Sequence, residues 1–187
     1  MEYLYIILIT LPIALVSYSA AFWGGVYRCL CFSEKLKMVI AFAIILAVMY
    51  WLGSWTGNSF ANTLAWLSIP IAEAIMLLVA VKMVFGAFRI RPEQKSYNLA
   101  KNGELIAVAF AASLNAFMIG LGTGLLRPIN EFILYIIPAS VILFAYLGDY
   151  TGKRYGKYIY ITLAGVTAGI SILALGIILA IDLYNLI

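Results

Sequence analysis

The sequence predicts an all-α membrane protein: six transmembrane helices that form two inverted three-helix repeats. Hydrophobic residues make up 65% of the 187 residues and charged residues 11%, with a mean hydropathy of +1.05. These values lie far outside the range of soluble domains. Six apolar stretches are each long enough to cross a bilayer, and two short motifs occur in both halves of the chain. These three observations carry the prediction.

The predicted spans follow one another closely and leave little chain for a soluble domain. About 20 mostly apolar residues cross the hydrocarbon core at 1.5 Å per residue. The first span follows Met1-Glu2-Tyr3, without the basic region of a cleavable signal peptide, so we expect it to be retained. The spans cover approximately residues 3–25, 38–57, 63–88, 105–126, 132–151 and 158–181.

The two motifs recur at nearly the same spacing. Ser17-Tyr18-Ser19-Ala20 returns 96 residues later as Ser113-Leu114-Asn115-Ala116. Leu52–Gly57 returns 95 residues later as Leu147–Gly152. The spacing predicts a duplicated unit, which places the first repeat at 1–88 and the second at 105–187. Residues 89–104, which include Pro92 and several charges, form the expected linker.

The basic residues predict the orientation. They gather in the first, third and fifth connections, whereas the second contains none and the fourth contains Arg127 with Glu131. By the positive-inside rule, the three basic connections are cytoplasmic and both termini are outside. Because each repeat has three spans, the second repeat begins on the opposite side of the membrane and therefore runs in the opposite direction to the first. Inverted repeats commonly enclose a transport pathway, which suggests a transporter.

Short stretches across nearly the whole chain are similar to one family of membrane proteins. They are Phe32–Leu36, Trp51–Gly53, Lys82–Phe88, Ala111–Gly122 and Gly148–Lys157. On these residues the chain resembles the manganese efflux pumps of the MntP type, in the lysine-exporter superfamily. The resemblance implies six helices, a duplicated fold and Mn²⁺ as a substrate rather than a cofactor.

The chain departs from the family pattern where the resemblance would place the charged site. The family typically carries Asp before Ala in a Ser-x-Asp-Ala pattern in both repeats. Here Ser19 and Asn115 stand at those positions, and Leu46 stands near an acidic position of the second span. Carboxylates suit Mn²⁺ because they are hard oxygen donors and because their negative charge offsets that of the ion. In this chain neutral side chains stand in their place. The site is therefore expected to be less acidic than in the family.

Ser19, Asn115 and Glu73 are the predicted substrate-binding residues, with Glu73 and Asn115 as candidate metal ligands. Glu73 is an acid within an apolar span, which indicates function by default. The alternatives for Glu73 are a protonated or paired carboxyl that faces the bundle, or a position closer to the membrane surface than the predicted span implies. Ser19 and Asn115 could instead bond to their own helices. Additional candidates on neighbouring helical positions are Ser17, Ser113, Met76 and Met118.

Two alternative functions are compatible with these observations. The first is a secondary transporter of Mn²⁺ or a related small solute, with an altered site. The second is a non-transporting membrane subunit or assembly partner derived from the same fold. An enzyme is not expected, because the chain has no His and no hydrolase motif.

The expected partners are the lipid bilayer, a small cation or solute and, as an option, further copies of the chain. Neither nucleic acid nor a cofactor is expected.

Two further charged residues, Lys82 and Asp149, lie within predicted spans near their cytoplasmic ends. Lys82 is expected to extend toward the headgroups, as long basic side chains do near span ends. Asp149 is expected to pair with Lys153, four residues further along the same helix, or to gate the cytoplasmic entrance.

Overall fold

Six long helices make up the regular structure of the described residues in this computed structural model. The structure describes residues 2–27, 31–61, 63, 67–88, 99, 101–126, 131–157 and 159–184. Each helix is long and apolar enough to cross a membrane, so the predicted six-helix membrane fold is confirmed. The helices are α1 (Glu2–Tyr27), α2 (Phe32–Ala61), α3 (Ser68–Phe88), α4 (Asn102–Leu126), α5 (Glu131–Tyr155) and α6 (Ile159–Tyr184).

Helix α2 begins at Phe32, six residues before the predicted span, and a local capping interaction explains this start. The Glu34 carboxylate accepts a hydrogen bond of 2.9 Å from the backbone N–H of Cys31, and the Lys35 N–H donates to the Cys31 carbonyl at 3.0 Å. This is the side-chain half of a capping box. Lys35, which falls between the predicted spans 3–25 and 38–57, therefore lies on a helix.

The ends of other helices also differ from the predicted spans. Helix α4 begins at Asn102, inside the expected linker 89–104, and α5 continues to Tyr155. Residues 89–98 and 100 of that linker lie outside the described residues. Lys153 and Arg154 consequently occupy the last turn of α5. Basic side chains are favourable there, because they interact with the negative end of the helix dipole.

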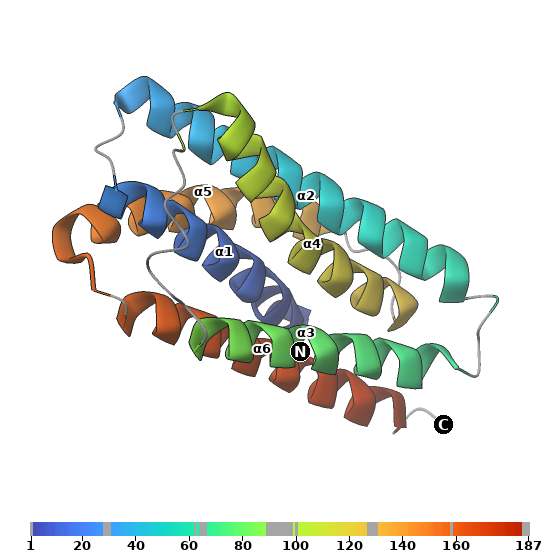
Figure 1. Cartoon of the computed structure of the whole chain (residues 1–187). Helices are drawn as coiled ribbons and strands as arrows, with labels where there is room; N and C mark the ends of the chain where they lie inside the picture. Colours follow the sequence, from blue (N-terminus) through green and yellow to red (C-terminus); the bar gives the residue numbers. More distant parts are fainter. Residues whose placement is uncertain are drawn as a thin grey trace.

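The helices pack in a pattern that is consistent with an inverted repeat. Helix α1 packs on α5 and α2 packs on α4, while α3 and α6 contact each other. Exchanging α1 with α4, α2 with α5 and α3 with α6 reproduces these contacts. Figure 1 shows that the members of each exchanged pair run in opposite directions. The principal core lies among these helices and includes Phe42, Leu46, Ile137 and Ile172.

Glycines set the closest approaches between the repeats. A Cβ on Gly53 of α2 would collide with the backbone carbonyl of Phe117 on α4, and one on Gly120 of α4 would collide with that of Tyr50 on α2. On the other side of the bundle, a Cβ on Gly148 of α5 would collide with the carbonyl of Tyr18 on α1. Small residues allow backbones to approach in this way within membranes. The glycines of the repeated motif therefore have a packing role.

Candidate functional site

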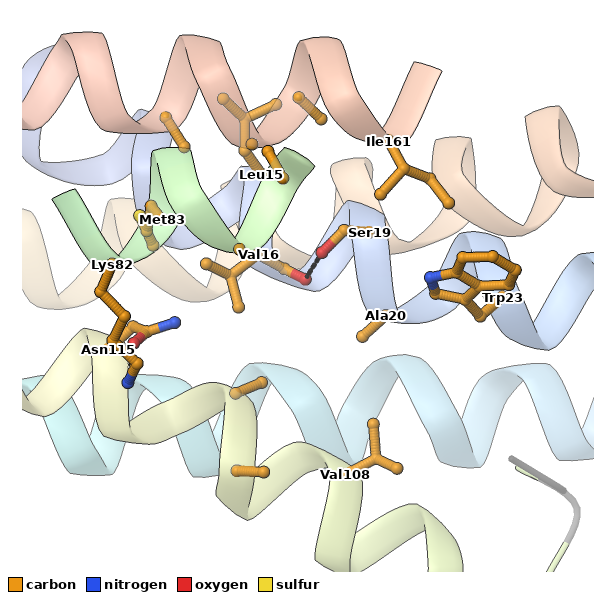
Figure 2. Close-up of a pocket in the computed structure, with 17 residues that line it drawn as sticks. Leu15, Val16, Ser19, Ala20, Trp23, Lys82, Met83, Val108, Asn115 and Ile161 are labelled. Atoms are coloured by element: carbon orange, nitrogen blue, oxygen red, sulfur yellow. Dashed lines mark hydrogen bonds between the residues drawn. The ribbon is translucent and has the colours of Figure 1, made fainter. Parts of the chain in front are cut away.

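A cavity of about 350 Å³ lies between α1, α3, α4 and α6. Its polar lining residues are Ser19 from α1, Lys82 from α3 and Asn115 from α4. The remaining lining is apolar and mostly small, with Trp23 as its largest member. Ser19 and Asn115, which occupy corresponding positions of the recurring sequence motif, thus line one space (Figure 2).

The cavity extends toward the helix ends that carry the basic residues. Trp23 lies four residues before the end of α1, Ala87 next to the end of α3, and Ile161 two residues after the start of α6. At the other extreme the lining reaches Leu15 and Asn115, deep within their helices. The space therefore connects the middle of the bundle with the end of the basic connections.

Ser19 and Asn115 make different polar contacts. The Ser19 hydroxyl donates a hydrogen bond of 2.9 Å to the carbonyl of Val16, one turn back, which leaves its lone pairs as acceptors. The Asn115 Oδ1 atom accepts a hydrogen bond of 2.9 Å from the Lys82 ammonium. Figure 2 shows the Lys82 and Asn115 side chains pointing toward one another from facing helices. The polar part of the site therefore consists of two neutral side chains, Ser19 and Asn115, and one positively charged group, the Lys82 ammonium.

Lys82 was missed as a residue of this site. It was expected to extend toward the headgroups, but its side chain lines the cavity and contacts Asn115. The available signal was its position inside an apolar span, because ionisable residues there commonly mark functional pathways.

Glu73 lies elsewhere. It lines a separate cavity of about 160 Å³ between α3 and α6, together with Met76, Leu77, Ile172 and Gly176 among others. The structure therefore brings Ser19 and Asn115 to one cavity and Glu73 with Met76 to another. Among the residues that the structure describes, three or more acidic, Cys or His side chains do not gather as a metal site.

The remaining candidates pack within the bundle. The Ser17 hydroxyl is buried, donates to the Ala14 carbonyl at 2.6 Å and also lies 3.4 Å from the Val141 carbonyl on α5. The equivalent Ser113 hydroxyl is buried and donates to the Phe110 carbonyl at 2.7 Å. Met118 is half-buried against the core. None of these three lines the cavity of Ser19 and Asn115.

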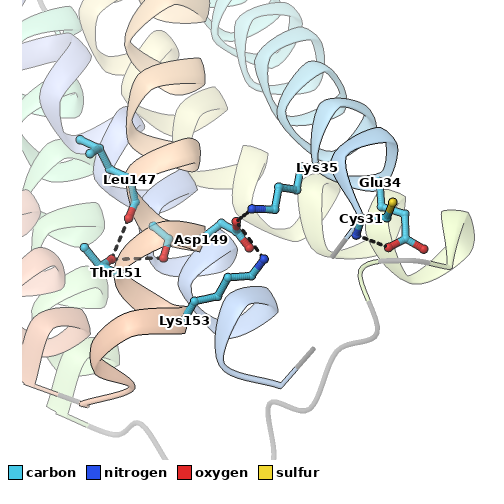
Figure 3. Close-up of polar contacts among 8 residues, drawn as sticks. Cys31, Glu34, Lys35, Leu147, Asp149, Thr151 and Lys153 are labelled. Carbon is cyan, nitrogen blue, oxygen red and sulfur yellow. Dashed lines mark hydrogen bonds and ion pairs between the residues drawn. The ribbon is translucent and has the colours of Figure 1, made fainter. Parts of the chain in front are cut away.

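A charge cluster around the buried Asp149 joins α2 to α5 at the basic end of the bundle. Asp149 of α5 has a side chain that is 2% exposed, and its Oδ2 atom lies 2.7 Å from the Lys35 ammonium on α2. The Lys153 ammonium lies 3.8 Å from the same oxygen, so the expected contact within α5 is confirmed. The closer partner, Lys35, comes from α2, which the sequence did not indicate (Figure 3).

Comparison with known proteins agrees with this architecture. A family model described as "Putative manganese efflux pump" matches residues 29–180. A "Putative manganese efflux pump MntP" of Rippkaea orientalis is 28% identical over 82% of this chain and 81% of its own length. The protein with the same name from Crocosphaera subtropica is 26% identical over the same shares.

No solved structure matches the chain. The family match extends from the connection before α2 into α6 and contains Lys82 and Asn115, though not Ser19. Six helices of membrane-spanning length and this match over most of the chain lead to one conclusion. The chain is an integral membrane protein that belongs to the manganese efflux pump family.

Proposed function

We propose that the protein is a secondary transporter that exports Mn²⁺, or a closely related small cation, through the cavity between its repeats. The relatives are named as manganese efflux pumps, which are transporters and not enzymes. We extend this activity to the chain, with no enzymatic reaction and no resident cofactor. Both termini are placed outside the cell, and the three basic connections are placed in the cytoplasm.

One observation carries the proposal: Ser19 and Asn115 line the same cavity from equivalent positions of the two repeats. In an inverted repeat, equivalent positions exchange environments when the two halves exchange conformations. A site built from such a pair can face either side of the membrane in turn. With the basic end in the cytoplasm, the cavity described here faces inward.

The site chemistry supports weak binding of a hard cation. The Ser19 hydroxyl and the Asn115 carbonyl are neutral oxygen donors, and oxygen donors suit Mn²⁺. A cation that keeps part of its water shell needs fewer protein ligands, and a cavity of about 350 Å³ leaves room for such waters. We therefore place substrate binding at Ser19 and Asn115. The role of Glu73 as a metal ligand stays a prediction, which the separate cavity of Glu73 does not favour.

The Lys82 contact favours the second candidate, a membrane subunit that has lost transport. An ammonium on Asn115 repels a divalent cation, and among the described lining residues no carboxylate compensates for it. A protein of this kind would keep the six-helix scaffold and act through a partner, which includes further copies of itself.

A manganese-sensitivity assay separates the two functions. The protein is expressed in cells that lack their own manganese exporter, and cellular manganese is measured after a Mn²⁺ load. We expect the native protein to lower cellular manganese, and Ser19→Ala and Asn115→Ala to abolish most of that effect. Ser59→Ala and Asn58→Ala, at exposed positions outside the cavity, are matched controls that should export normally.

Each result has a defined meaning. Normal export by both cavity variants would show that the site lies elsewhere. If the native protein left cellular manganese unchanged at equal membrane abundance, the transport proposal would be rejected in favour of the non-transporting subunit.

A further inference from the structure

The ammonium of Lys82 occupies the place in the cavity where a transported cation would contact Asn115. Its Nζ atom lies 2.9 Å from Asn115 Oδ1, the atom of that side chain that could bind a metal ion. We propose that Lys82 is a built-in competitor of the substrate cation and sets how tightly the cavity binds it. This inference rests on the proposed function, because it assigns the substrate to the same cavity.

The first argument is the use of the available oxygen. The Asn115 carbonyl oxygen has two lone pairs, and its nitrogen carries only donors. With the Lys82 ammonium 2.9 Å from Oδ1, a cation on the second lone pair would share this oxygen with a positive charge and would be repelled by it. The substrate therefore binds Asn115 favourably only after the ammonium has moved away.

The second argument is the charge balance of the cavity. Lys82 is the one charged residue in the described lining, which otherwise contains Ser19, Asn115 and apolar side chains. A positive charge that no nearby carboxylate neutralises repels a second cation strongly in a low-dielectric surrounding. The two aspartates that the resemblance implies would have offset such a charge, but Ser19 and Asn115 are neutral.

The third argument is mobility. Lysine carries its charge on a flexible four-carbon stem, so the ammonium can leave Asn115 by rotation of the side chain alone. Lys82 is exposed and lies on α3, whereas Asn115 lies on α4, so neither helix must shift for the contact to break. Return of the ammonium to Asn115 would then expel a bound cation, which gives the cavity low affinity and ready release.

Equilibrium binding of Mn²⁺ to the purified, detergent-solubilised full chain tests the inference without requiring transport. Lys82→Met removes the charge and keeps the length of the side chain, whereas Lys82→Arg keeps the charge. Lys37→Met, at an exposed position near the start of α2, is the matched control. We expect Lys82→Met to lower the dissociation constant for Mn²⁺ at least about tenfold. Lys82→Arg and Lys37→Met should bind like the native chain.

Transport kinetics in proteoliposomes give the second readout. We expect Lys82→Met to lower KM by a factor similar to the gain in affinity, and its maximal rate to fall, since release of a tighter-bound cation is slower. If Lys82→Met does not fold, as judged by gel filtration, Lys82→Leu takes its place, because it is neutral and has no donor for Asn115.

The possible results are decisive. Unchanged or weaker Mn²⁺ binding in the neutral variant overturns the inference, as does a gain in Lys82→Arg equal to that in Lys82→Met. A gain confined to the neutral variant supports the inference even if the native protein exports no manganese. Conversely, native export without this gain leaves the transport proposal intact and removes only the role of Lys82.

Discussion

The Lys35 ammonium on α2 lies 2.7 Å from the Oδ2 atom of Asp149 on α5, at the basic end of the bundle (Figure 3). The pair links α2 to α5, and the Asp149 side chain is almost completely buried. Asp149 stands in the second copy of the recurring motif where the first copy has Ser54, so the corresponding position on α2 carries no charge.

Asp149→Asn is expected to destabilise the protein by about 1–3 kcal/mol, because it removes the charge from hydrogen-bond distance of Lys35. The measurement is thermal unfolding in detergent. Lys35→Gln should cost more than Lys153→Gln, because the Lys153 ammonium lies 3.8 Å away instead of 2.7 Å. Equal losses for the two lysine variants would contradict the assignment of Lys35 as the principal partner.

Gly148→Ala is expected to lower stability by about 1–3 kcal/mol, because its Cβ would collide with the Tyr18 backbone carbonyl and α1 would have to move away from α5. Gly103→Ala is the control, since a Cβ there meets nothing within 4 Å. The control should be neutral or slightly stabilising, because Ala favours the helix over Gly. A melting temperature for Gly148→Ala equal to that of the control would show that this helix contact is not close.

Tyr50→Phe is expected to cost about 0.5–1 kcal/mol. The Tyr50 hydroxyl lies 3.3 Å from the Thr123 hydroxyl, in a buried hydrogen bond that joins α2 to α4. Hydrogen bonds between membrane helices have such modest values. Tyr135→Phe, at an exposed position of α5, should leave unfolding unchanged. A loss of similar size in both variants would argue against the interhelical bond.

Glu73→Gln is expected to leave Mn²⁺ export close to the native rate, whereas Asn115→Ala should reduce it by roughly tenfold or more. The reason is that Glu73 and Asn115 line different cavities. Initial rates in Mn²⁺-loaded vesicles provide the comparison. The reverse order of effects would move the substrate site to the cavity of Glu73 and Met76.

Replacing both neutral residues by acids, Ser19→Asp with Asn115→Asp, is expected to raise Mn²⁺ affinity by at least about tenfold, since carboxylates supply both hard oxygen and negative charge. Binding is measured on the purified protein. Asn115→Asp alone should gain less, because its carboxylate would pair with Lys82 at the present hydrogen-bond distance. Ser59→Asp with Asn58→Asp serves as the charge-matched control outside the cavity.

The membrane fold could be predicted because its signals are local. Hydropathy over about 20 residues identified six spans that agree with α1 to α6, apart from a few residues at most ends. The start of α2 was the largest extension, because the Glu34 cap begins the helix ahead of the apolar run, in a stretch that contains Ser33, Glu34 and two lysines. The recurrence of Ser17–Ala20 as Ser113–Ala116 also predicted that Ser19 and Asn115 correspond.

The contacts between side chains of distant helices could not be obtained in this way. Hydropathy shows that Lys82 and Asp149 lie in or near the membrane, but it does not show which neighbour each one faces. That depends on how the helices rotate and approach one another, which is governed by backbone contacts such as Gly53 on Phe117 and Gly148 on Tyr18. The packed bundle therefore decided that Lys82 meets Asn115, that Lys35 meets Asp149 and that Glu73 lies in a separate cavity.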